Sequence, residues 1–177
     1  MPRKVLKDTP LPGFFGKLPC TGDFVARGLP TVFRGRWDAW VTRHLAGRLR
    51  DGVVWPEAGL RFRLVSGGRV AAGVIVPGRD AAGRVFPLSL MIVGAALPGA
   101  ADLDAWCDAA LSAALPAQNG KADADDLQDA LEALSPPNGP RADTSGMVIW
   151  TREMPPLTCD PTDPTDALNR ALPISCC

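Results

Sequence analysis

Residues 13–24 read G-F-F-G-K-L-P-C-T-G-D-F, and no other stretch of this sequence is as distinctive. Its glycines permit sharp turns or close approach to another backbone. Its phenylalanines carry large apolar surfaces that favour burial. Lys17 and Asp23 are its charged residues. The stretch therefore predicts a short buried strand followed by a tight loop, with Lys17 and Asp23 as a polar pair at the mouth of that loop.

A phosphate-binding loop is a second interpretation of the same residues. A Walker A loop needs G-x-x-x-x-G-K-[ST], with the hydroxyl of the last residue on magnesium. Here Leu18 follows Lys17 in place of the hydroxyl residue. Pro19 comes next and would interrupt the helix whose N-terminus must face the phosphate. The pattern favours a structural turn over a nucleotide site.

Two further motifs follow in the first half of the chain. Residues 37–40 read W-D-A-W, and residues 77–88 read P-G-R-D-A-A-G-R-V-F-P-L. Together with G-x-x-G-K-x-P-x-x-G-D-F at 13–24, and in this order, they resemble the TagF family of bacterial type VI secretion accessory proteins. Gly78 stands where that family commonly has serine.

The resemblance implies a three-layer α-β-α domain and a cytoplasmic, post-translational repressor of type VI secretion. It implies a link to threonine-phosphorylation control and a forkhead-associated scaffold protein as the partner, bound stoichiometrically and without turnover. Some relatives are fused to a PP2C-type phosphatase. In this sequence we find no aspartate motif for such a domain, so we expect any phosphatase partner to be a separate protein.

Length and composition predict one domain. The chain has 177 residues, which we divide into a leader at 1–12 and a single domain at 13–177. Lys and Arg together number 19, as do Asp and Glu, so bulk charge does not favour nucleic acid as a partner. The longest apolar run, at 85–97, is too short and broken to span a bilayer. No signal peptide is evident, and we expect a cytoplasmic protein without membrane insertion.

Metal and disulfide chemistry find little support in the sequence. Five cysteines and one histidine do not form a spaced zinc-ligand set, and we expect reduced thiols. Asp123, Asp125, Asp126 and Asp129 invite a calcium interpretation, but an EF-hand loop needs a mid-loop glycine that is missing. Acids at the N-terminus of a helix explain these residues better. We predict no cofactor and no metal.

Hydrophobic periodicity predicts the elements. Spacings of three and four residues indicate helices at 31–50, from 103 to 115, and from 123 to 134, with a break at 116–120. Alternating or β-branched runs indicate strands at 60–65, 70–76, 86–93 and 147–150, the first two as an antiparallel hairpin. The proline- and threonine-rich end, 155–177, is predicted to be poorly ordered apart from a helical turn or two at 166–172. The fold class is α/β with a mixed or mostly antiparallel sheet and helices on both faces.

No residue is predicted to be catalytic. His44 lies on or beside the apolar stripe of its helix, where a packed imidazole is favoured over a general base. Cys107 falls on a buried helix face. The best candidates for surface chemistry are Lys17, Asp23, Asp80 and Arg84 at the two glycine-bearing loops, which we predict to bind a partner. Asp80 and Arg84 either pair across their turn as an exposed ion pair, or Arg84 is left to bind a partner's carboxylate.

Two other functions remain open at this point. A small enzyme could use Cys20 or Asp23 in the 16–24 loop, with Lys17 lowering the pKa of the thiol. A structural subunit of the secretion machine is the third possibility. Which protein is bound, whether the chain forms oligomers, and which signal relieves repression do not follow from the sequence.

Overall fold

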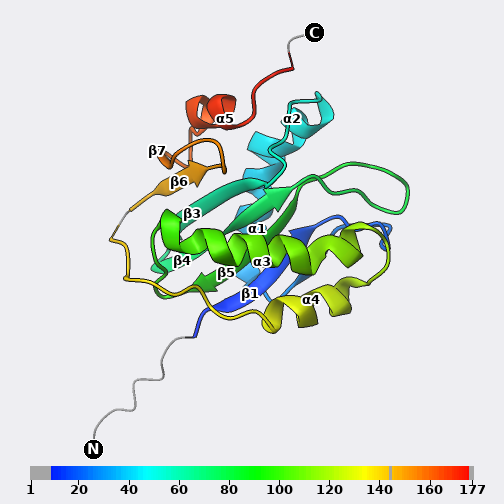
Figure 1. Ribbon diagram of the computed structural model, residues 1–177. Helices are drawn as coiled ribbons and strands as arrows, with labels where there is room; N and C mark the ends of the chain where they lie inside the picture. Colours follow the sequence, from blue (N-terminus) through cyan, green and yellow to red (C-terminus); the bar gives the residue numbers. More distant parts are fainter. Residues whose placement is uncertain (1–8, 144, 176–177) are drawn as a thin grey trace, which may run out of the picture.

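A computed structural model describes residues 9–143 and 145–175 (Figure 1). Its centre is a seven-stranded sheet with the order β2-β1-β5-β4-β3-β6-β7. Every neighbouring pair of strands is antiparallel. This confirms the α/β class and the mostly antiparallel sheet. The strands are β1 (Leu11–Gly16), β2 (Val25–Arg27), β3 (Leu60–Ser66), β4 (Arg69–Val76), β5 (Leu88–Gly94), β6 (Met147–Trp150) and β7 (Leu157–Cys159).

Side chains of the central strand β4 alternate between two hydrophobic cores. Val70, Ala72, Val74 and Val76 contribute to one core, and Ala71 and Ile75 to the other. Successive side chains of a strand point to opposite faces of a sheet, so each core lies on its own face. Between Ala71 and Ile75, Gly73 leaves no room for a side chain, since an added Cβ would lie 2.0 Å from the Leu90 carbonyl oxygen of β5.

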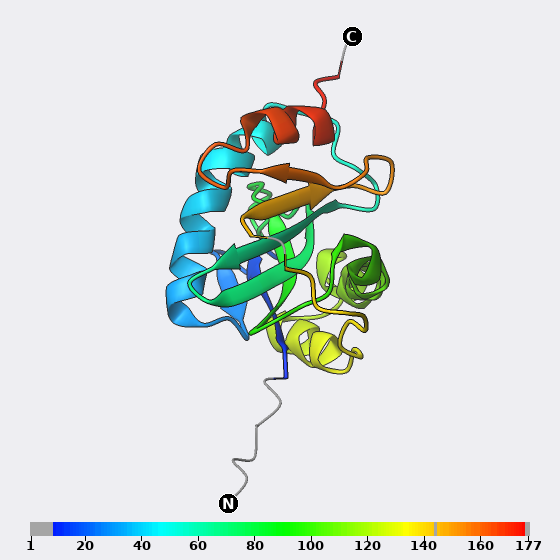
Figure 2. The ribbon, with the colours of Figure 1, turned by 90° about the vertical axis from the view of Figure 1, so that its left-hand side faces the viewer.

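Helices cover both faces of the sheet (Figure 2). On one face lie α3 (Ala100–Gln118) and α4 (Ala124–Glu132), which contribute Trp106, Cys107 and Leu127 to the first core. On the other face lie α1 (Thr31–Val41), a π-helical turn η1 (Thr42–Ala46), α2 (Gly47–Arg50) and α5 (Thr165–Ala171). Trp37, Val41 and Leu45 of this second group are buried in the second core.

Several sequence predictions were wrong in detail. Helix α3 continues through Pro116 to Gln118, so the one helical hydrogen bond lost with the proline N–H does not end the helix there. Strand β1 begins at Leu11, inside the predicted leader, while residues 1–8 lie outside the described part. Strand β7 lies in the segment predicted to be poorly ordered, whereas α5 confirms the helical turns predicted at 166–172; residues 176–177 are not described.

Strand β3 departs furthest from its predicted pattern. Its alternation of apolar and charged residues indicated a half-buried strand, yet Arg61 and Arg63 are buried. The Arg61 guanidinium reaches α3, where it binds Asp104 Oδ1 at 2.6 Å and Asp108 Oδ1 at 2.5 Å. Arg63 donates to the backbone carbonyl oxygens of Leu97, Pro98 and Ala142. Arg61 therefore links the sheet to α3, and Arg63 links it to the loop before α3 and to the loop that contains Ala142.

Candidate partner-binding site

Sheet topology brings the two longest motifs together. Strand β1 ends at Gly16 beside the start of β5, with Phe15 opposite Ser89, so the loop after β1 lies next to the loop that joins β4 to β5. We call the loops 17–24 and 77–87 together the loop surface; it lies at the right-hand side of Figure 1, near the C-terminal end of α3.

Two glycines allow the loops to approach closely. An added Cβ at Gly16 would lie 2.4 Å from the Pro87 carbonyl oxygen, and the φ of Gly16 is +149°, which side-chain-bearing residues rarely adopt. An added Cβ at Gly78 would lie 2.8 Å from the Lys17 carbonyl oxygen and 2.7 Å from that of Phe86. The backbones of the two motifs are therefore in direct contact.

The carboxylate of Asp80 fastens the loops to each other. Its Oδ2 accepts from Lys17 Nζ at 3.0 Å and from Arg84 Nε at 2.8 Å. Its Oδ1 accepts from the backbone N–H groups of Ala82 and Arg84, both at 3.0 Å. The predicted pairing of Asp80 with Arg84 is confirmed. The predicted polar pair of Lys17 with Asp23 was wrong, because Lys17 turns to Asp80.

The carboxylate at the centre of this network is buried, contrary to the expectation of an exposed pair, although the Arg84 side chain is 64% exposed. Asp80 is 2% exposed, and Lys17 is also buried. Burial alone raises the pKa of the Asp80 carboxyl, but the hydrogen bonds and charges of Lys17 and Arg84 outweigh it and lower that pKa to about 2. Asp80 is therefore ionised at neutral pH, with both oxygens engaged inside the protein.

Hydrogen bonds from backbone N–H groups, from Arg84 and from the Thr21 hydroxyl further connect and shape the two loops. Ala81 N–H donates to the Thr21 carbonyl oxygen at 2.8 Å, and Arg84 Nη2 donates to that of Gly22 at 2.8 Å. The Thr21 hydroxyl bonds to the carbonyl oxygens of Leu18 and Asp23, both at 3.1 Å. These contacts span both motifs and fix the shape of the loop surface.

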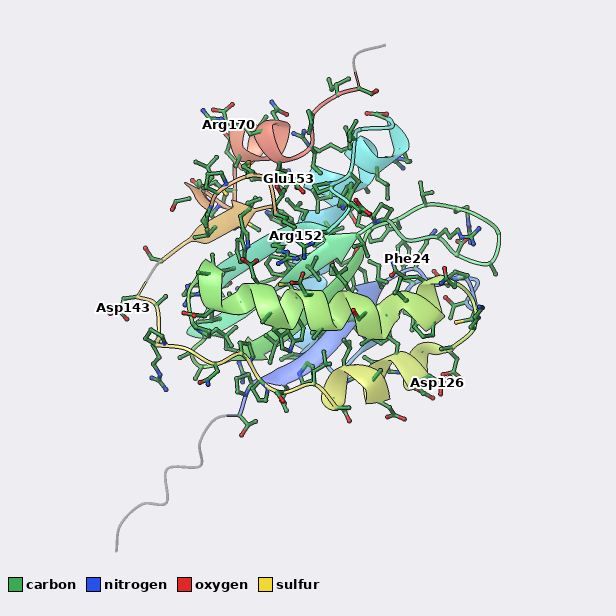
Figure 3. All side chains as sticks on the ribbon, in the orientation of Figure 1. Phe24, Asp126, Asp143, Arg152, Glu153 and Arg170 are labelled. Atoms are coloured by element: carbon green, nitrogen blue, oxygen red, sulfur yellow. The ribbon has the colours of Figure 1, made fainter. Side chains whose placement is uncertain are left out.

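Phe24 presents an aromatic ring on this surface (Figure 3). The sequence predicted its burial, but Phe24 is 49% exposed. Its ring packs edge-on against Phe86, with ring centres 4.8 Å apart, and stacks on Phe15 at 6.1 Å. Lys17 Nζ lies 4.9 Å from the centre of the same ring, a cation–π arrangement. The outer half of the ring is available for contact.

A half-open pocket of about 220 Å³ adjoins the network. Its lining combines the cations Lys17 and Arg79, the amide of Gln118, and the apolar residues Pro19, Pro77, Gly78 and Val85. Val85 is 43% exposed. The pocket lies between the two loops and the last turn of α3, which positions Gln118.

The four predicted partner-binding residues therefore differ in accessibility. Lys17 and Asp80 are buried and hold the loops, whereas Asp23 is exposed and the Arg84 side chain is 64% exposed. The Asp23 carboxylate accepts from the Phe24 N–H at 2.7 Å. Phe24 and Val85 were not among the predicted site residues. The only signal for them was an apolar residue beside a charged one in each loop motif.

The groups proposed for enzymatic chemistry are arranged as follows. Cys20 is exposed, but the Lys17 ammonium that could activate it is bound to Asp80. His44 is half-buried in η1, with its ring centre 5.3 Å from that of Trp40, and burial together with Arg43 and Arg48 lowers its pKa.

Asp123 and Asp126, which invited a calcium interpretation, form a reciprocal cap at the start of α4. Within residues 9–143 and 145–175, no group of three or more His, Cys, Asp or Glu side chains is placed to hold a metal ion.

No helix in the described ranges has both the length and the apolar character needed to cross a membrane.

Comparison with known proteins gives the class of this domain. No curated protein matches the chain. A crystal structure of PA0076 from Pseudomonas aeruginosa PAO1 is similar, with 26% sequence identity and a TM-score of 0.58; the match covers 81% of this chain and 72% of that one. The fold is thus an antiparallel α/β domain that a bacterial protein shares.

A sequence model of the TagF N-terminal domain, described as type VI secretion system-associated, matches residues 13–134. This chain belongs to that family, as the motifs at 13–24, 37–40 and 77–88 predicted.

Proposed function

We propose that this chain is a cytoplasmic, post-translational repressor of the bacterial type VI secretion system. In this proposal it binds a forkhead-associated scaffold protein stoichiometrically and performs no turnover. The family match over 13–134 carries the proposal, because it includes both motifs that build the loop surface. A PP2C-type phosphatase, as a separate protein, is the second partner that we propose.

The architecture of the loop surface supports a binding role. Lys17 and Asp80 satisfy each other in the interior, and the groups left at the surface are an aromatic ring, an arginine and an aliphatic side chain. Aromatic and arginine side chains are enriched among the residues that dominate binding energy in protein interfaces. A rigid loop pair also loses little conformational entropy when it binds. Arg84, Asp23 and Phe24 are therefore the contact residues that we propose.

The test measures binding of the purified chain to the forkhead-associated scaffold of the same secretion system by isothermal titration calorimetry. We expect a stoichiometry of one to one. Phe24→Ala should weaken binding at least tenfold, whereas Arg69→Glu should not, since Arg69 is exposed at the β3–β4 turn and far from the loops in the sheet. Arg84→Glu should also weaken binding, but it additionally places a carboxylate beside Asp80, so its fold must be verified first.

Secretion provides the second measurement. Loss of the chain should raise release of a type VI substrate, and the Phe24→Ala variant should fail to restore repression although it folds. Absence of any binding between the wild-type chain and the scaffold would refute the proposed partner. Normal repression by folded variants that no longer bind would refute the stoichiometric mechanism.

A further inference from the structure

The loop surface and the turn beside it carry more positive than negative charges. Cations outnumber carboxylates by one among the charged residues of the two loops and of the adjoining turn between α3 and α4, which are Lys17, Asp23, Arg79, Asp80, Arg84, Lys121 and Asp123. The turn adjoins the loops because an added Cβ at Gly120 would lie 3.8 Å from Pro19 Cβ. Asp80 pairs in the interior with Lys17 and also with the Nε of Arg84, whose side chain is otherwise exposed, so the excess charge belongs to exposed groups.

Apolar surface lies beside these cations. Lys17 connects the two parts, since it lines the pocket together with Arg79 and its Nζ lies 4.9 Å from the centre of the Phe24 ring. Arg79 and Val85 form an isolated β-bridge, so their backbones are paired across the 77–87 loop. Arginine side chains, an exposed aromatic ring and a recess are therefore close together.

We infer that the loop surface binds an acidic, extended segment of its partner, with carboxylate side chains on Arg79 and Arg84 and an apolar side chain against Phe24 and Val85. The inference rests on the proposed binding function and specifies the chemistry of the partner. The planar guanidinium of arginine suits a carboxylate, because it can donate two parallel hydrogen bonds. The pocket of about 220 Å³ accommodates a side chain of the segment rather than a free cofactor.

A second set of arginines offers a useful contrast. Arg34, Arg36 and Arg43 are exposed on α1 and η1, which cover the second core. Charge alone would attract an acidic segment there as well. The loop surface adds desolvated contacts with Phe24 and Val85 to the charge, so an acidic segment with apolar side chains should prefer the loops.

Nuclear magnetic resonance tests this preference. The ¹⁵N-labelled chain is titrated with the peptide acetyl-Glu-Leu-Glu-Glu-Leu-Glu-amide to millimolar concentration. Two control peptides replace its glutamates by lysine or its leucines by glycine. We expect saturable shift changes at the amides of residues 17–24 and 78–86, none with the lysine peptide, and weaker changes with the glycine peptide.

Variants then assign the contacts. Arg79→Glu should weaken peptide binding about tenfold or more, because it reverses a contact charge, whereas Arg69→Glu should leave it within about twofold. The amide spectrum of each variant reports its fold in the same experiment. Shift changes centred on α1, equal changes with the lysine peptide, or no change at the loops would each overturn the inference.

The peptide experiment can be interpreted whether or not the forkhead-associated scaffold is the partner. Binding of the acidic peptide at the loops together with no binding of the forkhead-associated scaffold would refute the proposed function and support the inference. Scaffold binding that Phe24→Ala weakens but Arg79→Glu leaves unchanged would support the proposed function and overturn the inference.

Discussion

Asp80 shows how one side chain can organise a surface without being on it. Its carboxylate accepts hydrogen bonds from Lys17, from Arg84 and from two backbone N–H groups. The pairing with Arg84 was predictable because the two residues are four apart in one turn. The pairing with Lys17 was not, because it joins residues that are 63 positions apart and depends on the neighbouring positions of β1 and β5.

The lowered pKa of Asp80 predicts a loss of stability in acid. The folded protein holds this pKa at about 2, below its ordinary value of 3.8, so ionised Asp80 favours the folded state. Its contribution is complete above about pH 4 and is lost as the pH falls toward 2. Asp80→Asn should lower the free energy of unfolding at neutral pH and flatten its dependence on pH between 4 and 2. Urea unfolding at a series of pH values measures both effects.

Asp129→Asn is the matched control, because Asp129 is an exposed carboxylate on α4. This variant should keep the wild-type slope between pH 4 and 2. The slope should be reduced in Asp80→Asn but not abolished, because Asp108 also has a lowered pKa: burial raises it, but the hydrogen bonds and charges of Arg61 and Arg152 outweigh burial. An unchanged slope in Asp80→Asn would contradict the assignment of the acid-sensitive contribution to the loop network.

Trp37 is the largest fully buried side chain of the second core. Its ring stacks on Phe62 with centres 4.4 Å apart, and its Nε1 donates to the Ser89 hydroxyl at 2.9 Å. Trp37→Ala should lower the free energy of unfolding by about 3–5 kcal/mol, because it removes packing and leaves a cavity. Val32→Ala, at an exposed position of the same helix, should change it by less than about 0.5 kcal/mol. Urea or thermal unfolding decides, and equal stability of the two variants would contradict this role for Trp37.

At the scale of elements, the sequence pattern correctly predicted the helices and hairpin that depend on residues close together in the chain. The amphipathic helix at 31–50, the antiparallel hairpin of β3 and β4, and the acidic start of α4 were all confirmed. The π-helical turn at Thr42–Ala46 was missed, because hydrophobic spacing alone does not distinguish it from an α-helix. Strands β2 and β7 were also missed; three residues carry too little pattern, and each strand forms by pairing with an edge that another part of the chain supplies.

The clearest error among the predicted elements was the expectation that the arginines of β3 face solvent. Arginine at alternate positions ordinarily indicates the solvent face of a strand. Here α3 places Asp104 and Asp108 opposite Arg61, so a charged residue is buried with its partners. The acids and the arginine lie 43 and 47 positions apart. Their pairing follows from the packing of α3 on β3, which the strand pattern does not contain.

The glycines of the first motif predict different responses to the same substitution. Gly16→Ala places a Cβ 2.4 Å from the Pro87 carbonyl oxygen and strains a residue at φ +149°. This change should destabilise the protein by about 1–3 kcal/mol or more and perturb the joint between the loops. Gly22→Ala meets no atom within 4 Å and should change stability by less than about 0.5 kcal/mol.

Thermal unfolding of the two glycine variants is the measurement, with amide spectra to locate the change. Gly16→Ala should shift signals of the 77–87 loop, because that loop supplies the clashing backbone. Similar melting temperatures for both variants would show that the close approach of β1 to Pro87 does not limit the loop structure.

At the scale of the whole molecule, one sheet supports both the loop surface and the two hydrophobic cores. It aligns the ends of β1 and β5 and so places two motifs, distant in sequence, on one surface. Sequence reasoning predicted that these motifs matter and which residues carry their charges. It did not predict which of those residues face solvent, because burial of Lys17 and Asp80 follows from the strand order, and the strand order was not derivable from the pattern.

The shared sheet also predicts how the protein unfolds. Alternate residues of β4 and β5 contribute to opposite cores, so neither core can open without disrupting strands that the other needs. We expect both faces to open in a single transition. Cys107 reports the α3 face: it is fully buried, and burial raises its pKa to about 12, so its thiol should react only when that core opens.

A second buried thiol tests the opposite face. In a variant whose other cysteines are replaced by serine, Ala46→Cys places a thiol in the core beneath η1, where Ala46 is buried. Labelling of the two thiols as a function of urea concentration should give the same midpoint as loss of the sheet signal in circular dichroism. Exposure of one thiol at lower urea than the other would show that the cores open separately, and that the sheet does not transmit the loss of one face to the other.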